Sequence, residues 1–387
     1  MLNQENVVLD AEQANVNSNA RSNARSNARD TLVSFEGVQK TYDGENLVVK
    51  NLNLEIERGE FLTLLGPSGS GKTTCLMMLA GFEFPTGGTI KLDGQLLNKV
   101  PPHKRNIGMV FQNYALFPHM TVGQNVAYPL QVRKIASHER TEKVKKALDM
   151  VQMNAFADRY PAQLSGGQQQ RIALARALVF DPKLVLMDEP LGALDKQLRE
   201  HMQLELKALH QRLGITFVYV THDQSEALTM SDRVAVFDQG IIQQLAVVEH
   251  LYEYPENQFV ASFIGDNNRF VGTLESVSGK LAGVRLPDGS LLTGTNVNAG
   301  QAGQAAVACI RPERIGLGTL DAGAPNALHA RVSGLIYFGD HVRVRGALNG
   351  QDDCFIKLML GDPALTGLAE GSSVALNLTP ERLRIFA

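Results

Sequence analysis

Apolar and polar residues follow different patterns in three successive parts of the chain. Residues 1–30 are polar and repetitive, and the tetrapeptide SNAR occurs three times in succession between residues 18 and 29. A segment with so little apolar surface cannot offset the entropy that is lost on ordering. We therefore expect residues 1–30 to be a disordered tail; an alternative use of its arginines is contact with an anionic membrane surface.

Strand-like patterns begin at about residue 31. The stretches TLVSFEGVQKTY (31–42) and NLNLEIERGEFLTLLG (51–66) alternate apolar and polar residues, as antiparallel strands do. Further along, KLVLMDEP (183–190) and ITFVYVTHD (215–223) are apolar runs too short for helices. Such runs are typical of parallel strands that are buried on both faces.

Helical spacing separates these strand-like segments. Residues 120–160 have apolar residues at the spacing of an amphipathic helix. A second helix carries a single apolar stripe that ends at a glycine: Leu198, Met202, Leu206, Leu209, Leu213 and then Gly214. Strands that alternate with helices predict an α/β domain with a parallel sheet, which we place at residues 31–243.

The pattern changes again in residues 244–387. Glycine becomes frequent, and the turn sequences PDG (287–289) and NG (349–350) stand between alternating apolar residues. This is the chemistry of β-hairpins. We expect an all-β domain of one or two small barrels, and its sequence contains no catalytic cluster.

Composition narrows the class of protein. A chain of 387 residues is too long for one core. Its formal net charge of −3 gives no basic excess, so we expect no nucleic-acid partner. The three cysteines, Cys75, Cys309 and Cys354, are too dispersed for a disulfide framework or a metal knuckle and are expected to be small buried apolar residues. The sequence also lacks an apolar run of membrane-spanning length and a signal-peptide core, so we expect a cytosolic protein that contacts a membrane only through partners.

A phosphate-binding motif follows the predicted strand at residues 61–65. Residues 66–73, GPSGSGKT, match the pattern G-x-x-x-x-G-K-[ST]. Its glycines allow successive N–H groups to face a phosphate, Lys72 can reach the β- and γ-phosphates, and the Thr73 hydroxyl can bind Mg²⁺. The predicted nucleotide-binding segment is Gly66, Pro67, Ser68, Gly69, Ser70, Gly71, Lys72, Thr73 and Thr74.

Two adjacent carboxylates end the apolar run at 183–190. Asp188 lies where open α/β sheets bind ligands, at the carboxyl end of a strand, and is expected to hold the Mg²⁺ shell. Glu189 is the candidate general base that polarises the attacking water. A DE pair that only caps a helix is the alternative.

Several motifs follow in a fixed order. Gln112 lies in MVFQNYALFP, LSGGQQQR occupies 164–171, GALD ends at Asp195, and His222 follows a predicted strand in VTHD. Together with the phosphate-binding motif and the DE pair, this order resembles the ATPase subunit of an ABC transporter. The resemblance implies an ABC ATPase domain with an antiparallel β subdomain and a helical subdomain, which hydrolyses ATP in the presence of Mg²⁺.

The same resemblance implies a role for individual residues. Tyr42 would stack on adenine, Gln112 would contact Mg²⁺ and water, and His222 would lie beside the γ-phosphate. Asp195 would connect two sites across a dimer, whereas Gly192 departs from the family, which more often has serine there. The residues that would grip the γ-phosphate held by an opposite subunit are Ser165, Gly166, Gly167 and Gln168. The implied catalytic set is Lys72, Gln112, Glu189 and His222, and the implied metal ligands are Thr73, Gln112 and Asp188. An ordinary strand tyrosine and a structural histidine are the alternatives for Tyr42 and His222.

The LSGGQ motif is a second glycine-rich anion site at the start of a helix. One chain has no use for two such sites on one triphosphate. Two chains that face each other head to tail use both sites, because each nucleotide then binds between the phosphate loop of one chain and the LSGGQ of its partner. We therefore expect a homodimer that ATP holds together and hydrolysis releases.

The β-rich part also resembles a known module. RPERIGL (311–317) and YFGDHVRV (337–344) resemble the accessory, OB-like barrel on ATPase subunits of bacterial importers, and FIGDNNRF (263–270) resembles the spermidine/putrescine branch. An alternative for Arg311 and Glu313 is an ordinary surface ion pair at a barrel corner.

The resemblance implies partners and a location. An importer ATPase is a peripheral protein on the cytoplasmic face of the inner membrane, where it binds two transmembrane permease subunits served by a solute-binding protein. Polyamine is the predicted cargo, with sugar, iron(III) or another small solute as alternatives. A soluble ABC ATPase of DNA repair or translation, or a regulatory subunit that binds ATP without hydrolysing it, are further alternatives.

Overall fold

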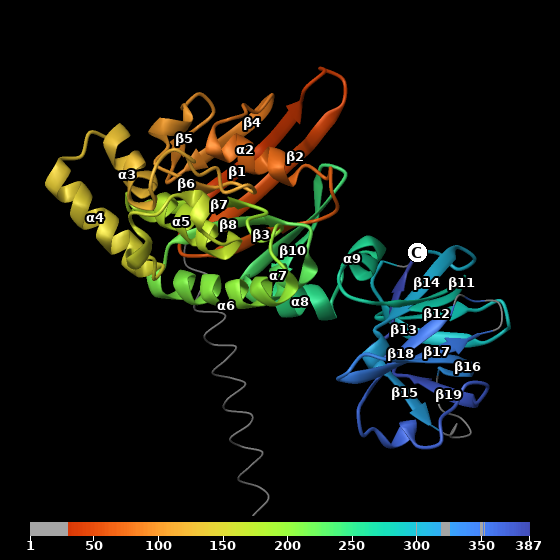
Figure 1. The fold of residues 1–387 in the computed structure, drawn as a ribbon. Coiled ribbons are helices and arrows are strands. Elements are labelled where there is room, and N and C mark those ends of the chain that lie inside the picture. Colours follow the sequence, from red (N-terminus) through yellow and green to blue (C-terminus); the bar gives the residue numbers. More distant parts are fainter. Residues whose placement is uncertain (1–29, 299, 319–325, 349–350, 352) are drawn as a thin grey trace, which may run out of the picture. The chain divides into compact units, whose positions relative to one another are not determined.

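The computed structural model describes residues 30–298, 300–318, 326–348, 351 and 353–387 (Figure 1). The predicted tail lies outside these residues except for Asp30, and so does the predicted turn at 349–350. The chain divides into two compact units, one that ends at Ile242 and one that runs from Gln243 to Ala387.

An antiparallel sheet forms one layer of the first unit. Its strand order is β2-β1-β4-β5, and β1 pairs with both β2 and β4. Buried residues alternate with exposed ones along β2, as the sequence pattern predicts for a sheet with one solvated face. The strands are β1 (Thr31–Thr41), β2 (Leu47–Glu57), β4 (Gly87–Leu92) and β5 (Gln95–Leu96).

A second, six-stranded sheet forms the core layer of this unit. Its order is β10-β9-β3-β8-β7-β6, and the neighbours from β9 to β6 are parallel. The two predicted parallel strands are confirmed as β7 and β8, and every residue of β8 is buried. The strands are β3 (Phe61–Leu65), β6 (Gly108–Val110), β7 (Leu184–Asp188), β8 (Thr216–Thr221), β9 (Arg233–Asp238) and β10 (Ile241–Val247).

One strand assignment from the sequence is wrong. Residues 51–66 do not lie in one antiparallel strand, because Phe61–Leu65 forms the centre of the parallel sheet, between β8 and β9. The alternation there is misleading, since Thr63 is fully buried and its hydroxyl accepts a hydrogen bond from Ser231 Oγ at 2.6 Å. A buried polar residue with a hydrogen-bond partner therefore looked like a solvated position.

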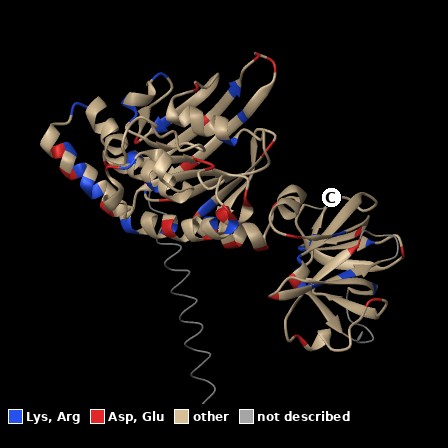
Figure 2. Cartoon of the chain, viewed as in Figure 1, with Lys and Arg blue, Asp and Glu red and all other residues tan. Residues whose placement is uncertain are grey.

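Helices cover the parallel sheet and build a separate group at one end of the unit. In Figure 1, α3 and α4 lie together away from the sheets, and α3 packs against both α4 and α5. Lysines, arginines and acidic residues are mixed along α4 in Figure 2, as on a solvated helix face. The helices are α2 (Lys72–Ala80), α3 (Val122–Val132), α4 (Ser137–Met150), α5 (Gly166–Leu178), α6 (Lys196–Leu213) and α7 (Gln224–Met230).

The apolar stripe predicted at 198–213 lies on α6. Met202, Leu206 and Leu209 are buried in the main core of the unit, and the outer two members of the stripe pack against that core. The helix ends as predicted, because Gly214 is left-handed with φ 62° and its N–H bonds to His210 O.

The second unit is β-rich, as predicted, but it begins with two short helices that the sequence pattern did not indicate. Its strands form a closed barrel, β11-β12-β13-β20-β14, and a sheet, β15-β19-β16-β17-β18, which share one core. The predicted PDG turn joins β12 to β13, with Gly289 at φ 89°. The elements are α8 (Val248–Glu253), α9 (Gln258–Phe263), β11 (Asn268–Ser278), β12 (Leu281–Arg285), β13 (Leu291–Asn296), β14 (Ala305–Ile310), β15 (Ile315–Gly318), β16 (Ala327–Tyr337), β17 (His341–Ala347), β18 (Cys354–Met359), β19 (Ser373–Leu378) and β20 (Arg384–Phe386).

The fold also bears on the predictions for the three cysteines and for membrane-spanning helices. All three cysteines are buried with free thiols, as expected, and burial raises the pKa of Cys75 to about 12. Within the part of the chain that the structure describes, no helix combines the length and the apolar character that crossing a membrane requires.

The stripe on α6 offers a matched test of the core. Leu206 is 2% exposed, whereas Leu204 on the same helix is 61% exposed. We expect Leu206→Ala to lower the free energy of unfolding by about 2–5 kcal/mol, because it leaves a cavity. Leu204→Ala should change it by less than about 0.5 kcal/mol. Urea unfolding measures both, and equal losses would show that this face of α6 is not buried.

Candidate nucleotide site

The phosphate-binding motif forms the loop between β3 and α2. Gly69 and Gly71 are left-handed, with φ of 79° and 101°. A Cβ atom on Gly66 would lie 2.2 Å from Phe237 O, and one on Gly71 would lie 2.8 Å from Val48 O. Backbone conformation and close packing therefore both require glycine here, and the loop leads directly into the N-terminus of α2.

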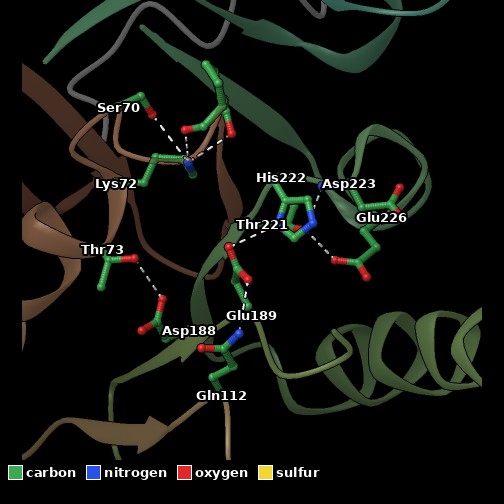
Figure 3. Close-up of polar contacts among 12 residues, drawn as sticks. Ser70, Lys72, Thr73, Gln112, Asp188, Glu189, Thr221, His222, Asp223 and Glu226 are labelled. Atoms are coloured by element: carbon green, nitrogen blue, oxygen red, sulfur yellow. Dashed lines mark hydrogen bonds and ion pairs between the residues drawn. The ribbon is translucent and has the colours of Figure 1, made fainter. Parts of the chain in front are cut away.

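Lys72 lies inside this loop. It is only 5% exposed, and its Nζ donates to Gly66 O and Pro67 O at 2.8 Å each and to Ser70 Oγ at 3.3 Å (Figure 3). Burial lowers the pKa of Lys72, against the opposing effects of Glu189 and Asp188. A buried ammonium surrounded by neutral oxygens is a strong point of attraction for a phosphate.

Thr73 and Asp188 meet at the carboxyl end of β7. Thr73 Oγ1 donates to Asp188 Oδ1 at 3.1 Å (Figure 3). Burial raises the pKa of Asp188. Within the described ranges there is no group of three or more His, Cys, Asp or Glu side chains that could form a metal cage. Mg²⁺ commonly takes one or two protein oxygens and completes its shell with phosphates and water, so Thr73 and Asp188 fit this ion.

Glu189 lies between Gln112 and His222, two of the other predicted catalytic residues. Gln112 Nε2 donates to Glu189 Oε2 at 3.3 Å, and His222 Nδ1 lies 3.1 Å from Glu189 Oε1 (Figure 3). Glu189 is left-handed, with φ 43°, and its backbone N–H bonds to Val220 O at 3.0 Å. A non-glycine residue in this conformation is strained, and such strain gathers at functional sites.

The predicted signature residues make contacts of their own at the start of α5. Ser165 Oγ accepts from Gln168 N at 3.4 Å, and Gln168 Oε1 accepts from Ser165 N at 2.9 Å, which forms a capping box. A Cβ on Gly166 would lie 3.2 Å from Leu194 Cδ2. The LSGGQ segment therefore packs against the segment that precedes Asp195.

Asp195 and Tyr42 make their contacts within other segments of the first unit than Glu189 and its partners. Asp195 is the N-cap of α6, and its Oδ1 accepts from Leu198 N at 2.9 Å. Tyr42 follows β1, is 61% exposed, and has Lys40 Nζ 4.6 Å from its ring centroid. An exposed aromatic face is available for stacking, and the two roles assigned from the sequence stay predictions.

Arg176 is a residue that the sequence analysis missed. This arginine of α5 is buried and donates at 2.7 Å to both Tyr114 O and Ala115 O. Tyr114 and Ala115 are left-handed, with φ of 61° and 48°, and follow Gln112 closely. The guanidinium thus stabilises a strained turn beside a candidate catalytic residue. A lone arginine within the apolar run IALARAL (172–178) was the available signal.

In the second unit, the surface ion pair considered for Arg311 and Glu313 is wrong. Arg311 is 8% exposed and donates to the carbonyls of Ile264, Asp266 and Tyr252. Glu313 instead accepts from Tyr252 Oη at 2.7 Å. Arg311 therefore ties the end of β14 to α8 and to the segment between α9 and β11.

Comparison with known proteins decides the family. The ABC transporter family matches residues 49–192, and the TOBE domain matches residues 308–386. The spermidine/putrescine import ATP-binding protein PotA of Thermobifida fusca is 46% identical over 90% of this chain and 92% of its own length. The chain belongs to the ABC transporter family of ATP-binding proteins. The PotA protein of Pseudomonas fluorescens is 47% identical over 82% of this chain and 86% of its own.

Solved ABC cassettes agree with this assignment. The ATP-binding cassette MJ0796, solved as a dimer in a post-hydrolysis state bound to ADP and Pi, is 36% identical, with a TM-score of 0.51 over 56% of this chain and 99% of that one. The predicted fold class is confirmed: an ABC ATPase domain followed by a β-barrel domain. The chain is an ABC-type ATPase that binds ATP through its cassette.

Replacing the carboxylate of Glu189 with an amide tests its assignment as the general base. We expect Glu189→Gln to bind ATP as the parent does, because its amide keeps the shape of the side chain and the residues of the phosphate loop are unchanged. Hydrolysis should fall by about 10²–10⁴-fold, since the group that accepts the proton from water is lost. Phosphate release measures this, with Glu139→Gln on the exposed face of α4 as control. Parent-like hydrolysis by Glu189→Gln would refute the assignment.

Proposed function

We propose that two copies of this ATPase bind ATP between them and power the import of a polyamine through two transmembrane permease subunits. A solute-binding protein would deliver the cargo, and the ATPase would lie at the cytoplasmic face of the inner membrane. The observation that carries this proposal is similarity to import ATP-binding proteins over up to 90% of the chain.

The separation of two anion sites within one chain supports the dimer. Lys72 and the phosphate loop lie at the carboxyl edge of the parallel sheet, whereas the capping box of Ser165 and Gln168 lies at the start of α5 and packs beside Asp195. Free N–H groups at a helix start attract phosphate oxygens. A partner chain would bring this second anion site to the phosphates, and the ATP-binding cassette MJ0796 has been solved as a dimer.

The roles proposed for the side chains follow from their contacts. Glu189 would accept a proton from the attacking water, and Gln112 and His222 would hold its carboxylate in place from either side. Lys72 would neutralise phosphate charge, and Tyr42 would stack on the adenine. Mg²⁺, when bound, would supply charge stabilisation for the transferred phosphoryl group, with Thr73, Asp188 and Gln112 as its proposed protein contacts.

Mixing two inactive variants tests the shared site. Lys72→Ala removes the lysine that would contact the phosphates. Ser165→Arg places a bulky side chain in the LSGGQ segment, where it would obstruct the phosphate site of the partner chain. A mixed dimer then contains one doubly defective site and one intact site. We expect each variant alone to be inactive and a mixture to recover up to about a quarter of the parent rate, because half of the random pairs are mixed. A mixture as inactive as its components would contradict a shared site, and Ser137→Arg at the start of α4 controls for the added charge.

Cargo is tested in the complete complex. With its permease subunits in vesicles and its solute-binding protein present, the ATPase should accelerate when spermidine or putrescine is added outside, and radiolabelled polyamine should accumulate with ATP inside. Maltose and iron(III) serve as competitors and as alternative cargoes. Stimulation by one of these but not by polyamines would exclude polyamine as the cargo while leaving the importer proposal intact.

A further inference from the structure

A buried carboxylate, that of Glu226, lies four residues after His222 in the chain. Glu226 of α7 is 2% exposed, and its Oε2 accepts from Thr221 Oγ1 at 2.6 Å (Figure 3). The same oxygen accepts from Tyr219 Oη at 2.8 Å. A carboxylate in such a place is expensive unless donors satisfy it. Two hydroxyls from β8 meet that need, and they tie the start of α7 to the end of the strand that carries His222.

The Thr221 hydroxyl is bonded on both sides. It donates to Glu226 and accepts from the backbone N–H of Asp223 at 2.9 Å. His222 is the single residue between Thr221 and Asp223, so this bridge closes around its backbone. The imidazole on that backbone lies 3.1 Å from the Glu189 carboxylate. The direction of the imidazole thus depends on a hydroxyl that Glu226 holds in one orientation.

Arg199 extends this arrangement to the start of α6. Its Nη1 donates to Asp223 Oδ2 at 3.3 Å and its Nη2 to Leu194 O at 2.9 Å. Its Nε lies 3.9 Å from Glu226 Oε1 and has no hydrogen-bond partner among the described residues. One guanidinium therefore touches both the His222 segment and the segment that precedes Asp195.

We propose that Glu226 is a positioning residue for ATP hydrolysis, which acts by holding Thr221 so that His222 stays against Glu189. Arg199 links this arrangement to the segment of Asp195, where the partner chain would bind. The inference rests on the proposed function, because it needs His222 and Glu189 to serve hydrolysis. Glu226 itself is buried and touches no reacting group.

A matched pair of hydroxyl deletions tests the proposal. Thr221→Val removes the donor that holds the His222 backbone, and Tyr219→Phe removes the other donor to the same Glu226 oxygen. If Glu226 acts through Thr221, then Thr221→Val should lower kcat about tenfold with an unchanged KM for ATP, because the phosphate loop is untouched. Tyr219→Phe should stay within about twofold of the parent. Equal losses in the two variants would overturn the proposal, since Glu226 would then matter only for packing.

Glu226 itself is tested by Glu226→Gln in a double-mutant cycle. The isosteric amide keeps the volume but replaces the charged acceptor with a neutral one, whose hydrogen bonds from Thr221 and Tyr219 are weaker, so kcat should fall in the same direction as in Thr221→Val. In a His222→Ala background, Glu226→Gln should cause no further loss, because the residue through which it acts is gone. Losses that multiply would show that Glu226 acts independently of His222 and would overturn the proposal.

A readout without activity separates this inference from the proposed function. In the nucleotide-free chain with ¹⁵N-labelled histidine, Glu226→Gln and Thr221→Val should broaden or shift the ring signals of His222, whereas Tyr219→Phe should leave them in place. If the parent chain hydrolyses no ATP, the proposed function fails, and these ring signals still decide whether Glu226 orders His222. Unchanged ring signals in both variants would overturn the inference.

Discussion

The carboxylate of Glu189 is the point where three segments of the first unit meet. Glu189 directly follows β7. Its carboxylate contacts Gln112, which follows β6, and His222, which follows β8. Parallel neighbours end at the same edge of a sheet, so residues 77 and 33 positions away from Glu189 in the sequence come within hydrogen-bond distance of it there. The left-handed backbone at Glu189 and its bond to Val220 O orient the side chain across that edge. The site depends on this geometry, because neither flanking residue could reach Glu189 from another strand order.

Buried guanidinium groups stabilise the irregular backbone around this framework. Arg105 donates to two carbonyls at the end of α2 and to two after β5, Arg176 donates to two behind Gln112, and Arg311 donates to three before the barrel. In each case the bonds run to backbone oxygens, which would be costly to bury without a donor. Burial lowers the pKa of all three arginines, yet a guanidinium stays charged and offers several donors in one plane. Arginine can therefore serve several carbonyls that no regular element satisfies.

The two anion sites of the chain differ in how complete they are. In the phosphate loop, Lys72 is bonded to Ser70, and Thr73 is bonded to the nearby Asp188. The LSGGQ segment has a capped helix start that packs on the next segment of chain and is joined to no catalytic side chain by the bonds it makes. This difference is what a site divided between two copies requires, since the second half needs to be shaped but need not be catalytic by itself.

The sequence by itself determined the local features of this protein. The glycines of the phosphate loop, the caps of α5 and α6 and the stop at Gly214 all depend on the conformations of neighbouring residues, which short motifs encode. Tertiary structure decided which distant residues meet. The spacing of apolar residues indicates which positions are buried but not which residues they pack against. For this reason Phe61–Leu65 was assigned to the wrong sheet and Arg311 was considered as a surface ion pair, and Arg176 and Glu226 went unnoticed. For Phe61–Leu65 the deciding contacts are with residues up to 171 positions further along the chain, as in the bond from Phe61 N to Asp232 Oδ2, and Arg176 reaches carbonyls 61 and 62 positions back. Such contacts exist only once the strand order has been formed.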